Sequence, residues 1–183
     1  MPQAAERMVI VITGPIASGK STVAGELARE LGRAGVPVAV IDLDVVHDML
    51  ASDGHKTGHP TWELARRAAA SLANTFLEEG VAVVVAEGSF NTPGDRSAFA
   101  QHLDAGVDPL YVSLRVSYEE ALRRAQTDPT RGVSRDPAVL GPYFGAVGHG
   151  LGTVPETDLV IETERMSPTS AAAAIARLVS PDS

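Results

Sequence analysis

The segment 8–34 places a strand, a glycine-bearing turn and a helix in immediate succession. Met8–Thr13 reads Met-Val-Ile-Val-Ile-Thr, a β-branched run typical of a strand buried on both faces of a parallel sheet. Apolar residues then recur at helical spacing over 19–34, and Gly35 and Pro37 end that helix. Because a buried strand followed directly by a helix is the repeating unit of α/β folds, this order restricts the architecture to that class.

The rest of the chain repeats the alternation of strand and helix, which its 183 residues can hold in one domain over 1–183. Further strands are expected over 36–41, 81–86, 110–116 and 158–162. Helices are expected over 45–50, 60–79, 95–105, 117–126, a short stretch that ends near 146 before a glycine-rich linker, and 168–178. This order predicts a mostly parallel sheet covered on both faces, with ligands at the carboxyl ends of its strands.

The turn after the first strand has the composition of a phosphate-binding loop. Gly14-Pro-Ile-Ala-Ser-Gly-Lys-Ser-Thr22 fits the pattern Gly-x-x-x-x-Gly-Lys-Ser/Thr in its required strand-to-helix context. Glycines let successive amides converge on one anion, and the start of the following helix adds positive potential. A glycine-rich turn that only packs is the alternative. The residues expected to bind a nucleotide here are Gly14, Ala17, Ser18, Gly19, Lys20, Ser21 and Thr22.

Two of these residues have more specific expected roles. Lys20 supplies a full positive charge to the β- and γ-phosphates of a nucleoside triphosphate, and we assign it a catalytic role. The Ser21 hydroxyl suits a Mg²⁺ ligand. The sequence therefore predicts ATP and Mg²⁺ as cofactors.

Carboxylates follow the second and third expected strands. Alternation along an extended chain would place Asp42 and Asp44 on the same side, where we expect Asp42 to help hold hydrated Mg²⁺. Asp44 is expected to bind the acceptor hydroxyl and take its proton. Glu87 is expected to contact Mg²⁺-bound water or the acceptor. The alternatives are acids that cap the next helix and, for Glu87, a surface acid at a strand end.

The segment 127–137 is polar and broken by proline and glycine, so we interpret it as a mobile lid. Arginines suit the spread charge of a transferring phosphoryl group, and a closing lid would exclude water. We assign Arg131 and Arg135 catalytic roles and group Arg124 with them at the site. The alternative for each single arginine is a solvated charge on the protein surface, which is equally compatible with the sequence.

Histidines and aromatic residues give weaker signals. A metal site formed by His47, His55 and His59 is not favoured, because no supporting partner is evident and the last two lie in a broken loop over 52–60. Three aromatic residues either line an acceptor pocket or pack against the core: Trp62, Phe90 and Tyr143. Among these, Phe90 is the one we place on the acceptor side.

Composition narrows the classes of function. The chain has no cysteine, which excludes disulfides and thiolate chemistry and fits a reducing cytoplasm. A net charge of −8 argues against a nucleic-acid binder, because such proteins present a basic face. No apolar stretch approaches the ~20 residues that cross a bilayer, so no membrane partner is expected.

Taken together, these segments resemble the small P-loop kinases that include chloramphenicol phosphotransferase, shikimate, gluconate and adenylylsulfate kinases and the zeta toxins. The matching pieces are Gly14–Thr22, Asp42–Asp44, Glu87–Pro93 and the arginines of 124–135. The resemblance implies a three-layer P-loop NTPase fold with a five-stranded parallel sheet and a lid. It also implies an adenine site between Arg124 and the turn at Ser167-Pro168.

The functional hypothesis is an ATP- and Mg²⁺-dependent phosphotransferase that moves the γ-phosphoryl group to a hydroxyl of a small molecule, either a metabolite or an antibiotic. The alternatives are a nucleoside or nucleotide kinase and a nucleotide-binding regulator without catalysis. Residues 52–63 match none of the named families, which leaves the acceptor open. ATP versus GTP preference and oligomeric state are open as well.

Overall fold

A computed structural model describes residues 7–50, 59–129, 131–151 and 157–179. It contains a five-stranded sheet in the order β2-β3-β1-β4-β5, and the paired strands are parallel throughout. The strands are β1 (Met8–Thr13), β2 (Val38–Asp42), β3 (Val83–Gly88), β4 (Leu110–Arg115) and β5 (Leu159–Glu162). The expected five-stranded parallel sheet is confirmed, and the strand with the longest β-branched run is its centre.

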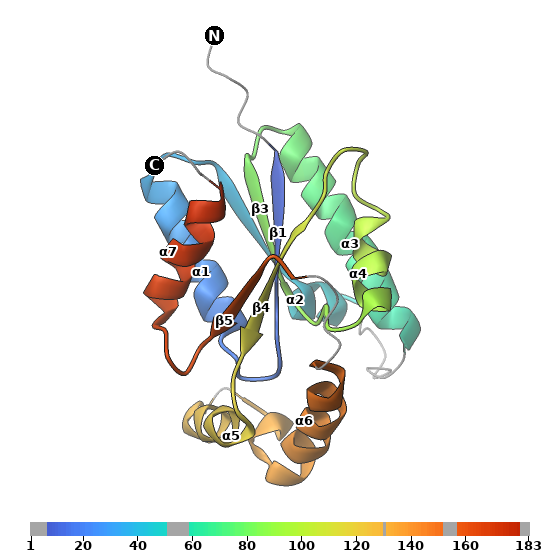
Figure 1. Cartoon of the computed structure of the whole chain (residues 1–183). Helices are drawn as coiled ribbons and strands as arrows, with labels where there is room; N and C mark the ends of the chain where they lie inside the picture. Colours follow the sequence, from blue (N-terminus) through green and yellow to red (C-terminus); the bar gives the residue numbers. More distant parts are fainter. Residues whose placement is uncertain (1–6, 51–58, 130, 152–156, 180–183) are drawn as a thin grey trace.

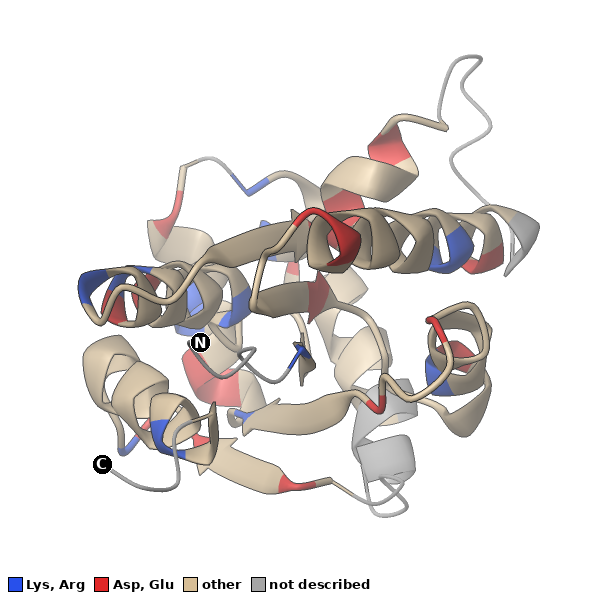
Figure 2. Cartoon of the chain, turned by 90° about the horizontal axis from the view of Figure 1, so that it is seen from above, with Lys and Arg blue, Asp and Glu red and all other residues tan. Residues whose placement is uncertain are grey.

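Helices surround this sheet, with a layer on each face and two helices beyond the carboxyl ends of the strands (Figures 1 and 2). They are α1 (Lys20–Arg33), α2 (Leu43–Asp48), α3 (His59–Glu78), α4 (Pro93–Ala100), α5 (Tyr118–Thr127), α6 (Pro137–Leu151) and α7 (Pro168–Val179), with a 3₁₀ turn η1 (Val133–Arg135). Helices α1 and α7 cover one face, and α3 and α4 cover the other. The expected α/β architecture with both faces covered is confirmed.

Alternate residues of β1 feed the two cores, as the pleat of a strand requires. Ile10 and Ile12 pack with α1 and α7, whereas Val9 and Val11 pack with α3 and α4. All four side chains are fully buried. This double burial fixes the end of β1, and with it the loop that follows.

Helices α5 and α6 lie beyond the carboxyl ends of the strands, at the lower end of Figure 1. A third buried cluster joins Ala17 of the loop to Ala121 and Ala125 of α5 and to Leu140 of α6. The loop after β1 is therefore packed on one side by the sheet and on the other by these two helices. No helix in the described segments has the length and apolar character needed to cross a membrane.

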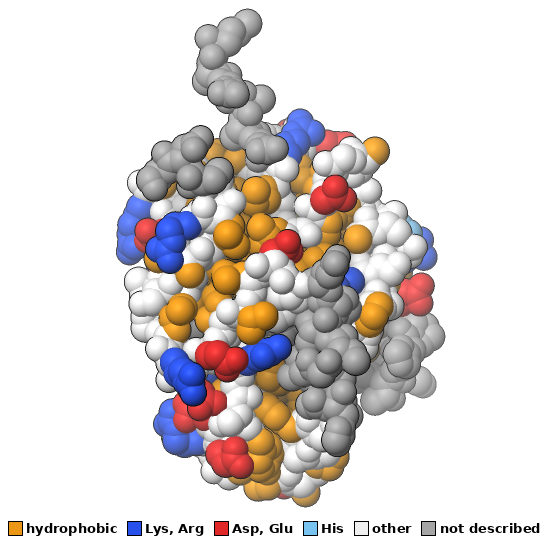
Figure 3. All heavy atoms as spheres, viewed as in Figure 1, with side chains coloured by type: hydrophobic (Ala, Val, Ile, Leu, Met, Phe, Trp, Pro, Cys, Tyr) orange, Lys and Arg blue, Asp and Glu red, His pale blue; other side chains and the backbone are white. Residues whose placement is uncertain are grey.

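The edges of the sheet are less well covered than its faces. Val40 of β2 is 44% exposed and Val160 of β5 is 42% exposed. Figure 3 shows apolar side chains gathered on the face that carries β5. Figure 2 shows that residues of both charges are interspersed along the helices.

Two of the differences from the expected element boundaries concern α2 and α6. Helix α2 begins at Leu43, directly after β2, because the Asp42 side chain caps it. Asp44 is therefore helical, and the expected alternation of the two acids along a strand is wrong. Helix α6 continues to Leu151 where a linker is expected. The expected loop over 52–60 falls mostly on 51–58, outside the described residues.

The start of α5 shows half of the usual capping arrangement. Ser117 caps it by accepting a hydrogen bond from the Glu120 amide at 3.3 Å. The Ser117 amide donates to the Glu164 carboxylate instead of to Glu120. The Glu120 carboxylate is already bound by Arg123 and Arg124, at 2.6 Å and 2.7 Å for the shortest contacts. A reciprocal capping box instead occurs at the start of α4, between Thr92 and Asp95.

Tyr111 of β4 gives a test of the packing. Its ring lies 4.2 Å below the Arg96 guanidinium, yet within the described residues its buried hydroxyl has no hydrogen-bond partner. We expect Tyr111→Phe to leave the free energy of unfolding unchanged or raise it by up to ~1 kcal/mol, because the desolvation cost of that hydroxyl is removed. Urea denaturation measures this.

The matched comparison is Thr13→Val, whose lost hydroxyl has two partners. Thr13 Oγ1 donates to Asn91 Oδ1 at 3.0 Å and accepts from the Phe90 amide at 3.1 Å. We expect a loss of about 1–3 kcal/mol, because buried groups are left unpaired. A Tyr111→Phe variant as destabilised as Thr13→Val would contradict the assignment.

Candidate active site

The loop after β1 presents unpaired backbone amides at the start of α1. Gly19 is the N-cap of α1, and no side chain caps that end. Gly19 has φ of 95° and Ala17 has φ of 62°, both in the left-handed region. The resulting turn directs the amides of the first helical turn outward, where an anion satisfies them.

Gly14 is required by a close approach to β4. A Cβ atom at Gly14 would lie 2.6 Å from the Leu114 carbonyl oxygen and 2.9 Å from Ser18 Oγ. In the described part of the chain, the buried Ser18 hydroxyl has no hydrogen-bond partner. An unpaired polar atom inside a loop with free amides fits a cradle whose polar ligand completes it.

Lys20 is held at this loop by the protein itself. Its ammonium donates to the carbonyl oxygens of Gly14 at 3.2 Å and Pro15 at 3.3 Å. Burial lowers the pKa of Lys20, and the nearby carboxylates of Glu87 and Asp44 oppose that shift. The charge is therefore kept beside the loop at a cost that an anionic ligand would reduce.

A cavity of about 120 Å³ gathers most of the predicted phosphate and acceptor groups. Residues from four parts of the chain line it: Ile16, Ala17, Gly19, Lys20, Ser21, Thr22, Asp44, Glu87 and Arg131. The structure thus brings the expected loop residues together with Asp44, Glu87 and Arg131. Their roles in binding and catalysis remain predictions.

Glu87 is the most perturbed acid of this cavity. It is 3% exposed, and burial raises the pKa of its carboxyl to about 7. A hydrogen bond with the Ser21 side chain and the charge of Lys20 oppose this shift, while the charge of Asp42 adds to it. Ser21 and Glu87 are therefore in contact, so a cation bound by Ser21 would lie near a carboxyl that it could ionise.

Asp42 and Asp44 occupy different environments. Asp42 Oδ1 accepts hydrogen bonds from the amides of Asp44 at 2.8 Å and Val45 at 3.2 Å, so it caps α2. Asp44 is exposed at the cavity, yet the protein around its carboxyl raises its pKa, with Lys20 opposing. The metal role of Asp42 stays a prediction. Asp44 has the better access to an acceptor.

A second cavity, of about 360 Å³, lies on the other side of the loop. Its lining includes Ala17, Ser18, Gly19, Thr22, Val23, Glu120, Arg123, Arg124, Asp128, Arg131, Thr163, Met166 and Pro168. It thus contains the expected Arg124 and the turn before α7, and Arg131 borders both cavities. Sequence reasoning missed Glu120, Thr163 and Met166, which carry no motif.

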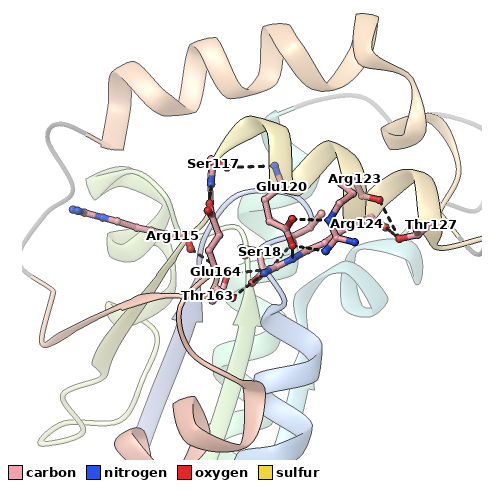
Figure 4. A network of polar contacts seen from close by, with 10 residues as sticks. Ser18, Arg115, Ser117, Glu120, Arg123, Arg124, Thr127, Thr163 and Glu164 are labelled. Carbon is pink, nitrogen blue, oxygen red and sulfur yellow. Dashed lines mark hydrogen bonds and ion pairs between the residues drawn. The ribbon is translucent and has the colours of Figure 1, made fainter.

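Arg124 connects three elements at this cavity (Figure 4). Its Nε donates to Glu120 on α5 at 2.7 Å, and its Nη2 donates to the Thr163 carbonyl after β5 at 2.8 Å. Longer contacts of 3.4 Å and 3.5 Å reach the carbonyls of Ala17 and Ser18 in the loop. Arg124 therefore fixes the wall of the cavity where the base of a nucleotide is expected.

Two predicted residues are not brought to the site. Arg135 is exposed and donates to the Gln126 carbonyl at 3.2 Å, and it does not border either cavity. Phe90 is 0% exposed and packs edge-to-face on Phe99 at 5.3 Å. The prediction that Phe90 contacts the acceptor is wrong, because its ring belongs to the core under α4.

Other aromatic residues divide between core and site. His47 is buried and stacks on Trp62 at 3.8 Å, and its Nε2 lies 3.2 Å from Thr61 Oγ1. Tyr143 of α6 is hydrogen-bonded to Asn91 and to the Ile16 backbone, beside the loop. His47 and Trp62 therefore brace α2 against α3, whereas Tyr143 lies at the site.

Cation binding must rely on few protein ligands. Within the described residues no three side chains of histidine, cysteine, aspartate or glutamate form a metal cluster. A Mg²⁺ ion fits here through Ser21 and the oxygens of a bound nucleotide, since Mg²⁺ keeps waters and uses one or two protein ligands beside phosphates.

A lysine-bearing loop between a central parallel strand and a helix, with carboxylates and an arginine opposite, is typical of a P-loop nucleotide site. The sequence of residues 9–136 matches the family described as the AAA domain, and the chain belongs to that family. Within it, the chain is similar to several small-molecule P-loop kinases.

Known proteins support this grouping. Adenylyl-sulfate kinase of Bacillus pumilus (strain SAFR-032) is 37% identical over 100 residues, covering 54% of this chain and 49% of the relative. The match thus spans about half the length of that curated relative. APS kinase of Mycobacterium tuberculosis, solved with AMPPNP and APS, aligns with a TM-score of 0.69 and 22% identity over 95% of this chain and 98% of that chain.

Shikimate kinase from Acinetobacter baumannii, solved with shikimate, aligns with a TM-score of 0.61 and 20% identity over 96% of this chain and 94% of that chain. At these identities the solved structures establish the fold. The three-layer P-loop fold is therefore confirmed.

Glu87 predicts a pH-dependent stability in Mg²⁺-free buffer. Because its folded-state pKa of about 7 lies above the ordinary 4.5, its stabilising contribution is full below pH 4.5 and is lost as pH rises to 7. We expect Glu87→Gln to gain stability relative to the unchanged protein, by on the order of 1–3 kcal/mol, between pH 5 and pH 8. Urea unfolding at both pH values measures the gain.

The control for this prediction is Glu79→Gln, which changes an exposed acid. We expect its stability difference from the unchanged protein to stay constant over the same pH range. A constant difference for Glu87→Gln as well would show that this carboxyl is ionised in the folded protein at pH 5.

Proposed function

We propose that this protein is an ATP- and Mg²⁺-dependent phosphotransferase that moves the γ-phosphoryl group to a hydroxyl of a small molecule. The observation that carries this proposal is the convergence of Lys20, Arg131 and Asp44 on one cavity beside the free amides of α1. The APS kinase that shares this fold was solved with the ATP analogue AMPPNP, which supports ATP as donor.

Different residues have different roles in the proposed phosphoryl transfer. The loop amides and Lys20 bind the β- and γ-phosphates, and Arg131 neutralises charge that spreads over the transferring group. Ser21, assisted by Asp42, would hold Mg²⁺, which supplies charge neutralisation when bound. Arg124 and the turn at Pro168 bound the base cavity.

Asp44 acts on the acceptor. The acceptor oxygen forms a bond to the γ-phosphorus while the bond from that phosphorus to the β–γ bridging oxygen breaks, and ADP leaves. The acceptor proton passes to the Asp44 carboxylate. The raised pKa of Asp44 makes its carboxylate a better proton acceptor than an ordinary aspartate.

We also propose that residues 1–183 form one kinase domain and that 127–137 is its lid. Arg131, within this segment, borders both cavities, while its Nε lies 3.3 Å from Asp128. Arg135 would reach the phosphates only if the lid moved, so its catalytic role depends on closure.

Removal of the loop cation tests the donor site. We expect Lys20→Ala to lower acceptor-dependent ADP formation by at least ~10²-fold, the scale of one preorganised charge contact in a transition state. Arg29→Ala, an exposed position on the same helix, is the control. Titration calorimetry with Mg²⁺ and ATP reports binding separately. Near-normal turnover by Lys20→Ala would contradict the donor site.

Replacement of the proposed base tests the acceptor step. We expect Asp44→Asn to lower kcat by ~10²-fold or more while the KM for ATP stays within about threefold, because general-base contributions are of that size. Asp48→Asn, on the same helix with a side chain 67% exposed, is the matched control. An unchanged kcat for Asp44→Asn would remove Asp44 from catalysis.

A further inference from the structure

A third cavity lies between α3 and α4 and has a volume of about 380 Å³. This volume falls within the range of small-molecule sites, about 300–1,000 Å³. Six side chains that can form hydrogen bonds line it: Glu63, Arg66, Thr92, Asp95, Ser97 and Gln101. The proposed phosphate, base and proton-transfer roles use none of them.

The chain segment that follows β3 connects this cavity to the phosphate cavity. It starts at Glu87 in the phosphate cavity and reaches Thr92 and Asp95 in the third cavity. Between them, the Ser89 carbonyl accepts hydrogen bonds from Arg66 at 2.8 Å and 3.3 Å. A molecule in the third cavity would therefore lie along the same short segment that carries Glu87.

Tyr143 interacts with residues of both cavities. Its side chain is hydrogen-bonded to Asn91 and to the Ile16 backbone, and the charges of both Asp44 and Asp95 act on it. Asn91 Oδ1 also accepts a hydrogen bond from Thr13 Oγ1 at 3.0 Å, so Asn91 connects Tyr143 to the end of β1.

The charges of the third cavity are balanced. Arg66 forms an ion pair with Asp95 at 2.8 Å, and the two side chains are 7% and 17% exposed. Glu63 adds a further carboxylate to the lining, so the described lining holds two carboxylates and one guanidinium. An anionic ligand would meet no uncompensated cation among these lining residues, whereas hydroxyl or ammonium groups would find partners.

On the basis of the proposed function, we propose that this cavity binds the non-reacting part of the acceptor, and that the acceptor is an uncharged or cationic polyhydroxylated compound of the sugar or amino-sugar type. Its reacting hydroxyl reaches Asp44, and an adjacent hydroxyl contacts the phenol group of Tyr143. The Arg66–Asp95 pair sets the selectivity against anionic acceptors. The phosphoryl group passes to the acceptor oxygen and its proton to Asp44, as in the proposed reaction.

Three compounds with the same six-carbon skeleton test charge selectivity. D-glucose, D-glucosamine and D-gluconate are neutral, cationic and anionic, and each is added at the same millimolar concentration to the full chain with Mg²⁺ and ATP. We expect glucose or glucosamine to stimulate ADP formation at least ~10-fold more than gluconate, the size of one charge contact. Greater stimulation by gluconate, or stimulation by none of the three, would overturn the proposal.

Variants of the cavity sharpen the test. We expect Asp95→Asn, which removes the ion-pair partner of Arg66 and leaves Glu63 as the one carboxylate of the described lining, to raise the ratio of gluconate to glucose stimulation at least ~10-fold, with Asp108→Asn as an exposed control. We expect Tyr143→Phe to raise the KM for the stimulating sugar ~10-fold while the KM for ATP is unchanged. Tyr118→Phe, a tyrosine that packs on Phe144 at 5.7 Å, is the control. Unchanged selectivity in Asp95→Asn would overturn the role of the ion pair.

The donor site is measured separately so that the two proposals fail differently. Calorimetry with Mg²⁺ and ATP in the absence of sugar reports nucleotide binding alone. Absence of that binding is a failure of the proposed kinase function. Nucleotide binding that persists while no neutral or cationic sugar is phosphorylated is a failure of the acceptor inference alone.

Discussion

The position of β1 at the centre of the sheet is the constraint on which the site depends. Its backbone pairs with β3 on one side and β4 on the other, with Thr13 in register with Gly88 and Ser113. Because β1 is held by both neighbours and by both cores, the loop that follows it has a fixed origin. The close approach of Gly14 to Leu114 then sets the path of that loop. Free amides can only be directed at a ligand when their origin is fixed in this way.

Charge balance is the second feature of the site. Lys20 and Arg131 face Asp44 and Glu87 across one small cavity. Burial disfavours the charged forms of Lys20 and Glu87, and each is partly stabilised by the other. The carboxyl of Glu87 is thus poised to change its charge when a cation or a phosphate enters. In the proposed function, this coupling of charges would favour the joint binding of an anion and a divalent cation.

Local signals account for what the sequence could predict. The first strand and the phosphate-binding loop could be predicted because their signals lie close together in the sequence. The β-branched run, the glycines and Lys20 all occur within residues 8–34. Competition among partners explains the misses. Asp42 starts α2 because its carboxylate accepts hydrogen bonds from two amides, and Glu120 does not complete a capping box with Ser117 because two arginines bind its carboxylate. The contacts of Phe90 with Phe99 depend on packing that no local pattern records.

The described contacts also restrict how the site can close. Arg124 ties α5 to the loop and to the Thr163 carbonyl, so α5 is anchored to both walls of the base cavity. In contrast, Arg131 and Arg135 contact residues that are close to them in the sequence. Arg131 forms an ion pair with Asp128, and Arg135 donates a hydrogen bond to the Gln126 carbonyl. Under the proposed function, movement that brings further positive charge to the phosphates would therefore occur in the segment after α5, with Arg124 at its fixed end. In the proposed kinase, such a division would keep the base cavity formed while the phosphate cavity opens and closes, since a ligand stabilises the closed form only through contacts that the open form lacks.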